Sequence, residues 1–395
     1  MVATQQDEIL AQVGKHLDRP DLAWLLGAGI SYDANIPLMN LLTSRVGDLI
    51  QQDDDKSYFD MYNSIRKGLP NEAHIEHILS QLGDIISLTE RAKEHKLTLN
   101  DVELEQERLK LLYKKIVDHI RTTIRYGYTK NGKDEEIGKF ENPIIRIHQH
   151  LSFVRAIYQV SRAGVQNRRS SVKFFTTNYD TLLEDALSFE RIACSDGFSG
   201  GAIGFWNPAN FGTNRSGDEA IVIKLHGSID WRFDEDRNLI KCRDGIHEKD
   251  TFSDVLIYPQ QTKYVETQKD PFSFLFKSFR SYLSSSKDQA LAICGYSFGD
   301  EHINLEIEAS MSLAGNNTTL LCFVQEPVDP TTKQPNLPQI ITKWLRTSNF
   351  KERIFVLTDQ GLYWGNIENR FPPDEGSQHN WWTFVGVTDL LENGF

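Results

Sequence analysis

Four short polar segments, each placed directly after an apolar run, constrain this chain of 395 residues more than any other feature. In sequence order they are Gly27-Ala28-Gly29-Ile30-Ser31, Thr176-Thr177-Asn178-Tyr179-Asp180, Leu225-His226-Gly227-Ser228 and Cys294-Gly295-Tyr296-Ser297-Phe298-Gly299-Asp300. The apolar runs are typical of buried strands. In an open parallel sheet the carboxyl ends of the strands meet at one crevice, where ligands bind. The order therefore predicts that a glycine turn, an Asn/Asp pair and a lone histidine converge, a combination suited to chemistry on a dinucleotide.

Composition bounds the class of protein. The length exceeds that of one typical core, which favours a large domain with an insertion or an extension. The net charge of −12 argues against broad electrostatic binding of nucleic acid, because phosphate contacts need clustered Lys and Arg. Basic residues do gather between positions 108 and 125, where a solvated helix face explains them better than a binding patch. Direct binding to nucleic acid is therefore not expected.

Cysteine usage and the chain start indicate a reducing compartment. Cys194, Cys242, Cys294 and Cys322 form no C-x-x-C pair, so neither a structural zinc site nor a disulfide framework is expected. The first residues lack a basic-then-apolar signal, and no apolar run reaches membrane-spanning length. We therefore expect a cytoplasmic protein without a metal site and without membrane association.

Hydrophobic periodicity predicts the order of elements. Helical spacing predicts a helix over 4–18 and a helix start at Ser31. It also predicts that 38–150 is almost wholly helical apart from a loop at 128–141, and that a further helix covers 143–160. Buried strands are expected at 21–26, 172–175, 221–225, 255–257, 290–294, 319–324 and 354–357, with helices at 181–187 and 272–283. Residues 188–219 are expected to form a long loop or a small lobe. The prediction is an α/β fold, a Rossmann-like parallel sheet with helices on both faces. It comprises a domain over 1–345, with a helical insertion at about 40–150, and a C-terminal extension over 346–395.

Each polar segment also has a purely structural explanation. The glycine turn could cradle a pyrophosphate, or it could be a tight turn without a ligand. Asp180 could form an Asx turn that begins a helix, and Asp300 could cap another. Gly295-Tyr296-Ser297 could hold phosphate or ribose, or only lead into that second helix. His226 could be an ordinary core residue, but its place among the other segments favours proton abstraction near neutral pH.

Taken together, the segments resemble the motifs of the sirtuin family. The first segment with Ile36-Pro37 resembles the family's G-A-G-I-S…G-I-P run, with Asn35 in place of the last glycine. Thr176–Asp180 resembles T-Q-N-I-D, His226-Gly227 resembles H-G, and Gly295-Tyr296-Ser297 resembles G-T-S, while Val324-Gln325-Glu326 replaces a ribose-contacting I-N segment. The segment from Gly295 to Asp300, with His302-Ile303-Asn304, is closest to the bacterial sirtuin-like effectors of antiphage defence.

The resemblance implies a Rossmann-type NAD site with defined residue roles. Asn178 would orient the nicotinamide ribose or an attacking water, and Asp180 would hold the carboxamide. His226 would bind a ribose hydroxyl and act as the base. The remaining positions would contact the pyrophosphate, the ribose and the adenosine side: Gly27, Ala28, Gly29, Ser31, Gly295, Ser297 and Gln325.

Departures from the sirtuin pattern bear on the reaction. After Ile36-Pro37 a deacetylase has Asp-Phe-Arg, whereas this chain has Leu38-Met39-Asn40. The zinc cysteines that follow H-G are missing, and Tyr258-Pro259-Gln260 stands where a peptide-clamping F-G-E strand is expected. We therefore expect water to accept the ribosyl group, which makes the chain an NAD glycohydrolase that yields nicotinamide and ADP-ribose.

Two rival functions and one assembly hypothesis stay open. A protein deacylase would need an acyl-lysine substrate, and a non-catalytic sensor would bind NAD or ADP-ribose without cleaving it. By analogy with related bacterial systems, the chain is expected to form a homo-oligomer and to pair with a HerA-type ring ATPase. The helical insertion and residues 346–395 are the segments expected to gate the site or to assemble.

Overall fold

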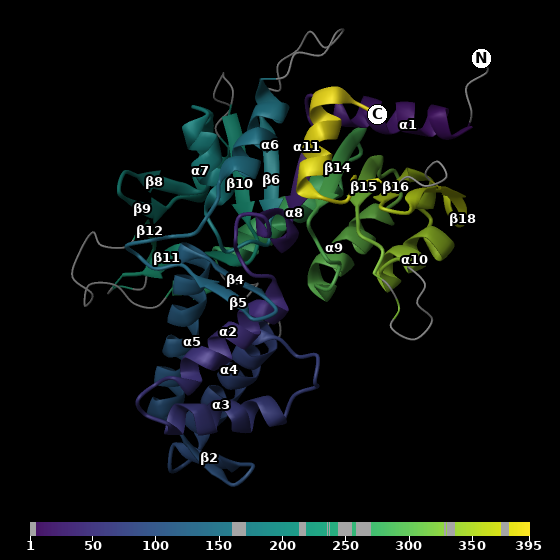
Figure 1. Cartoon of the computed structure of the whole chain (residues 1–395). Helices are drawn as coiled ribbons and strands as arrows, with labels where there is room; N and C mark the ends of the chain where they lie inside the picture. Colours follow the sequence, from purple (N-terminus) through teal and green to yellow (C-terminus); the bar gives the residue numbers. More distant parts are fainter. Residues whose placement is uncertain are drawn as a thin grey trace.

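The central element of the computed structural model is a nine-stranded sheet of order β18-β17-β16-β15-β14-β1-β6-β10-β7 (Figure 1). The structure describes residues 5–159, 171–212, 219–234, 236, 238–243, 255–257, 270–327, 329, 336–372 and 379–395. The strands are β1 (Ala23–Leu26), β6 (Val172–Thr176), β7 (Ala193–Ser195), β10 (Glu219–Lys224), β14 (Gln289–Cys294), β15 (Thr318–Phe323), β16 (Ile354–Thr358), β17 (Gly361–Trp364) and β18 (Asn366–Phe371). All pair in parallel except β17 and β18, which add an antiparallel edge.

The register of this sheet places the strand ends in one row. Leu26 of β1 lies between Thr176 of β6 and Cys294 of β14. Thr176 is also paired with Lys224 of β10, and Cys294 with Phe323 of β15. The polar segments that follow these strands therefore leave the sheet at the same level and at the same edge.

Helices cover both faces of the sheet, as predicted. One face packs against α8 (Phe272–Leu283), α9 (Glu301–Met311) and α10 (Gln339–Thr347). The other face packs against α1 (Gln5–Leu17), α6 (His148–Tyr158), α7 (Leu182–Phe189) and α11 (Phe384–Asn393). Within β1, Leu25 belongs to the first core and Trp24 and Leu26 to the second, because successive strand side chains point to opposite faces. The predicted α/β class is confirmed.

A helical lobe forms between β1 and β6, at the bottom of Figure 1. Its helices are α2 (Met39–Gln51), α3 (Ser57–Lys67), α4 (Ile75–Arg91) and α5 (Gln106–Tyr126). They enclose an apolar core of their own, which also takes in Tyr179, Leu182 and Ile229. The lobe therefore rests directly on the segment that follows β6.

A second, antiparallel sheet follows the parallel strands β6 and β7 in sequence. Its order is β13-β11-β12-β9-β8, and its strands are β8 (Phe198–Gly200), β9 (Ile203–Trp206), β11 (Gly227–Phe233), β12 (Leu239–Cys242) and β13 (Val255–Ile257). A short 3-10 helix, η2 (Pro208–Gly212), packs beside β8. The described part of 188–219 is thus a small lobe, one of the two forms expected. Tyr258-Pro259-Gln260 lies outside the described residues.

The predicted helix content of 38–150 was too high. Two hairpins interrupt it, β2 (Lys96–Leu99) with β3 (Val102–Glu105) and β4 (Tyr128–Asn131) with β5 (Asp134–Ile137). The second hairpin occupies the predicted loop at 128–141. Asn100 and Asp101 adopt φ of 49° and 63°, which suits a tight hairpin turn and ends the helical periodicity that the sequence suggested.

Two predicted helix starts were also wrong. The segment after β1 forms only a 3-10 turn, η1 (Ala28–Ser31), and the next helix begins at Met39. Asn35 has φ of 65°, the left-handed region that suits the glycine it replaces, and Ile36 precedes a proline, which disfavours helix. The helix predicted from Pro143 begins at His148.

Residues 346–395 belong to the central sheet and its core. A 3-10 turn, η5 (Lys351–Arg353), leads into β16, which lengthens the parallel sheet beside β15. In α11, the Phe384 ring lies 4.8 Å from that of Phe153 on α6, and α11 lies beside α1 at the top of Figure 1. The boundary at 345 and a role of this segment in assembly stay predictions.

The turns after β1 and β14 interlock through glycines. The Gly29 N–H donates to the Gly295 carbonyl at 2.8 Å, and a Cβ at Gly27 would lie 2.6 Å from that oxygen. We expect Gly27→Ala to lower the free energy of unfolding by about 1–3 kcal/mol, because the neighbouring backbone must move. Urea unfolding measures this loss. Gly201→Ala, where no atom lies within 4 Å, is the control and should change it by at most about 0.5 kcal/mol. Equal effects of the two substitutions would contradict the interlock.

Candidate functional site

The segments after β1 and β6 are joined by a chain of side-chain hydrogen bonds. The Asn178 Nδ2 donates to Ser31 Oγ at 3.1 Å, and the Ser31 hydroxyl donates to Asp180 Oδ2 at 2.9 Å. All three residues are buried. Asn178 Oδ1 has no hydrogen-bond partner among the described residues. A buried acceptor in this state costs free energy, so this oxygen is suited to a ligand hydroxyl or a water.

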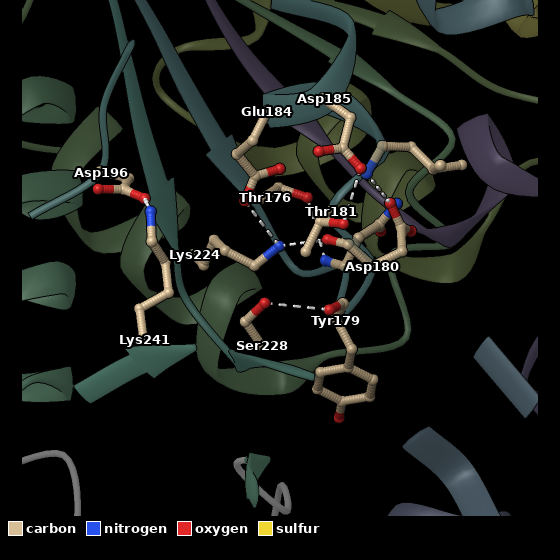
Figure 2. Close-up of polar contacts among 12 residues, drawn as sticks. Thr176, Tyr179, Asp180, Thr181, Glu184, Asp185, Asp196, Lys224, Ser228 and Lys241 are labelled. Carbon is tan, nitrogen blue, oxygen red and sulfur yellow. Dashed lines mark hydrogen bonds and ion pairs between the residues drawn. The ribbon is translucent and has the colours of Figure 1, made fainter. Parts of the chain in front are cut away.

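Asp180 has a structural and a site-forming oxygen. Its Oδ1 accepts a hydrogen bond from the Leu182 N–H at 3.0 Å, which is the Asx turn considered from the sequence. Its Oδ2 accepts from Ser31. The backbone carbonyl of Asp180 accepts from the buried ammonium of Lys224 (Figure 2). The carboxylate is therefore held by two hydrogen bonds, and Lys224 holds the backbone of the same residue.

His226 is paired with a residue from the last polar segment. Its Nε2 lies 2.9 Å from Asp300 Oδ2, and both side chains are 5% exposed. The other oxygen of Asp300 accepts from the N–H groups of His302 and Ile303, so the predicted cap of α9 is present. Sequence reasoning saw only this cap. The available signal was that Asp300 follows β14 and His226 follows β10, two strands of the same parallel sheet that end at the same edge.

The ionisation state of Asp300 determines which ring nitrogen of His226 carries the proton. Burial by itself raises the pKa of Asp300, but the hydrogen bond and charge of His226, with the N–H groups of Ile303 and His302, lower that pKa overall. Asp300 is therefore ionised at neutral pH. An ionised acceptor requires the proton of neutral His226 to sit on Nε2, which leaves Nδ1 as the nitrogen that can take up another proton.

Tyr179 links the two halves of the site. Its ring centroid lies 6.5 Å from that of His226, and its carbonyl accepts from Ile229 N at 3.0 Å and Ser228 Oγ at 3.2 Å (Figure 2). Its hydroxyl donates to the carboxylate of Glu76 on α4. Asn178 and His226 are thus held on the same side of the sheet, against the helical lobe.

The rim of the site carries the remaining predicted residues. Ala28, Ser297 and Gln325 are exposed at the carboxyl edge of the sheet, whereas Gly27 is buried and Gly29 and Gly295 are half-buried. The N–H groups of Gly27 and Gly29 already donate to Cys294 and Gly295. The expected helix N-terminus with open donors for a pyrophosphate is therefore replaced by the short turn η1. That prediction was wrong because the left-handed Asn35 and then Pro37 prevent a helix there.

His150 of α6 was missed from the sequence. It is fully buried, and its Nε2 lies 3.5 Å from Ser31 Oγ. Burial lowers its pKa to about 4, so it is neutral at physiological pH. Its position on the apolar face of a helix, beside Phe153 and Val154, looked like ordinary core from the sequence.

The described ranges contain no group of three or more His, Cys, Asp or Glu side chains arranged to hold a metal ion. The four cysteines are free thiols. Among the described helices, none has the length and apolarity needed to cross a bilayer.

The comparisons with known proteins point to one family of domains. Residues 172–351 match a family model described as SIR2-like domain. This segment contains Asn178, His226 and Asp300 but not Gly27 to Ser31, and it spans less than half of the chain. A comparison with curated protein sequences found no match.

Two of the solved structures that match are of Sir2 homologues. A Sir2 homologue–NAD complex is 11% identical with a TM-score of 0.32, and the match covers 80% of this chain and 84% of that one. A point mutant of a Sir2 homologue in complex with ADP-ribose is 11% identical with a TM-score of 0.31, over 83% of this chain and 91% of that one.

The buried His150 predicts a dependence of stability on pH. In the unfolded chain its pKa is 6.5, against about 4 in the native state, so below pH 6.5 the unfolded state binds more protons. The stabilising effect of a neutral His150 is present above pH 6.5 and is lost as the pH falls toward 4. Between pH 7 and 5 we expect a loss of about 2 kcal/mol from this group. Urea unfolding at both pH values should show a smaller loss for His150→Gln than for the wild type. An unchanged loss would contradict this assignment.

Proposed function

We propose that this protein is an NAD glycohydrolase, which cleaves the bond between nicotinamide and ribose and releases nicotinamide and ADP-ribose. The observation that carries the proposal is the convergence of Asn178, held by Ser31 and Asp180, with the His226–Asp300 pair at one edge of the sheet. The match of residues 172–351 to a SIR2-like domain supports a reaction that uses NAD. The missing deacetylase motifs favour water over an acyl-lysine as the acceptor.

The proposed reaction consumes NAD and water. The C1′–N bond breaks, the electron pair leaves with neutral nicotinamide, and the water oxygen forms the new bond to C1′. The proton lost by the water is taken up by His226 and later released to solvent. Asn178 Oδ1, which has no partner among the described residues, accepts a hydrogen bond from the water or a ribose hydroxyl. Buried, fixed dipoles stabilise the oxocarbenium-like transition state better than mobile water does.

Asp300 is the positioning residue of this proposal. Its carboxylate fixes the proton of His226 on Nε2 and stabilises the imidazolium that forms when Nδ1 takes up a proton. Asp180 holds the nicotinamide carboxamide. Ala28, Gly29, Ser297 and Gln325 contact the phosphates and the adenosine side from the rim.

Nearly all of the Asn178 and His226 surface is covered by protein, at 7% and 4% exposure. We propose that substrate reaches them only after a rearrangement, which suits an enzyme whose uncontrolled activity would deplete NAD. Tyr179 connects the site to the helical lobe through Glu76, which makes the lobe a candidate for this control. In keeping with the resemblance to antiphage effectors, we propose a homo-oligomer that is activated in defence together with a HerA-type ring ATPase.

Product analysis tests the reaction. The purified chain is incubated with NAD, with and without the ATPase partner and phage lysate, and the products are separated by chromatography. We expect equal amounts of nicotinamide and ADP-ribose. An acylated ADP-ribose formed only with an acyl peptide would instead establish a deacylase. Saturable binding without nicotinamide release under every condition would establish a sensor.

Substitutions test the roles of the residues. His226→Ala and Asn178→Ala should each lower kcat by about 10²–10⁴-fold with the fold retained, because each removes a group that acts in the transition state. Asp300→Asn should lower kcat less and shift the pH at which activity is half-maximal, since it changes the proton affinity of His226. His302→Ala, a histidine two residues beyond Asp300, is the matched control. Wild-type kcat in either alanine variant would refute its role.

A further inference from the structure

A cavity of about 510 Å³ lies between α7 and the antiparallel sheet. Its walls come from Thr181, Glu184 and Asp185 of α7, from Asp230 of β11, and from Lys241 and Arg243 at the end of β12. Ser188, Gly201 and Ala202 line its rim and are exposed, so it opens to solvent. None of these residues has a role in the proposed reaction.

The basic groups of the cavity are already matched to carboxylates. Lys241 pairs with Asp196 and Arg243 with Asp185. The buried Lys224, beneath the cavity wall, pairs with Glu184 at 3.2 Å (Figure 2). Asp230 forms no ion pair among the described residues, although its charge acts on Lys224, Lys241 and Arg243. It is 6% exposed, and its Oδ1 has no hydrogen-bond partner among the described residues.

A second acceptor lies on the same wall. Glu184 Oε2 is buried and also without a hydrogen-bond partner in the described part of the chain. Burial raises the pKa of Glu184 to about 7, although the charge of Lys224 acts to lower it. Both unmatched atoms are carboxylate oxygens, so they call for a donor, and for a positively charged one in preference to a neutral one.

We propose that this cavity binds a small organic amine, whose ammonium group donates to the carboxylates of Asp230 and Glu184. An ammonium carries three donors and one positive charge, which matches the two unpartnered carboxylate oxygens of Asp230 and Glu184. The volume accommodates a molecule of several non-hydrogen atoms rather than a single inorganic ion. The proposal does not rest on NAD cleavage.

The position of the cavity connects it to the candidate site. Lys224 holds both Glu184 and the backbone carbonyl of Asp180. An amine that binds Glu184 competes with Lys224 for this carboxylate. Its effect therefore reaches the Asp180–Ser31–Asn178 hydrogen bonds through a single side chain.

Calorimetric titration and thermal unfolding of the full chain test the proposal, with putrescine as the probe. We expect saturable binding and a rise in melting temperature with putrescine, and neither with 1,4-butanediol, its neutral isostere, or with potassium chloride at matched ionic strength. Asp230→Asn should bind putrescine at least about tenfold more weakly. Asp236→Asn, at an exposed position between β11 and β12, is the control and should bind putrescine like the wild type.

Asp230→Asn also tests the effect of the buried carboxylate on stability. Without putrescine, Asp230→Asn should melt at or above the wild-type temperature, because the amide removes a buried charge whose Oδ1 has no hydrogen-bond partner among the described residues. Equal binding of butanediol, equal stabilisation by potassium chloride, or unchanged putrescine affinity in Asp230→Asn would each overturn the proposal. So would the absence of putrescine binding to the wild type.

Discussion

The register of the parallel strands is the constraint on which the rest of the structure depends. Because Leu26, Thr176, Lys224, Cys294 and Phe323 share one row, the segments that follow them emerge together. A slip of one residue would turn every core side chain of a strand to the other face, so the buried apolar pattern holds this row in place. This row of strand ends therefore fixes the relative positions of the side chains in the candidate site.

Two carboxylates of the site each make one contact that begins a helix and one that forms the site. Asp180 begins α7 with one oxygen and holds Ser31 with the other, and Asp300 caps α9 with one oxygen and pairs with His226 through the other. The same groups that end a strand and begin a helix thereby orient the candidate catalytic atoms. Structural and functional explanations of these residues are therefore not alternatives here, and a choice between them from the sequence was not needed.

Charge is distributed unevenly around this row. His226 has an ionised partner in Asp300, whereas burial keeps His150 neutral. Lys224 donates to the Asp180 carbonyl, and Asp230 Oδ1 has no hydrogen-bond partner among the described residues. Burial increases the effect of these contacts on stability. In a low dielectric a paired charge or hydrogen bond is stronger than in water, and an unpaired one costs more free energy.

The sequence alone predicted the parallel strands β1, β6, β10, β14, β15 and β16 and the helices on both faces, because apolar runs and turn residues are local signals. It missed β7, and it left open whether residues 188–219 form a loop or a small lobe. It also placed Asn178, Asp180 and His226 at strand ends. Only the tertiary structure decided that Asp300 pairs with His226, that His150 underlies Ser31, and that two hairpins interrupt the helical lobe. These depend on contacts between residues as far apart as 226 and 300, or on backbone angles at Asn35 and Asn100, and no periodicity in the chain encodes them.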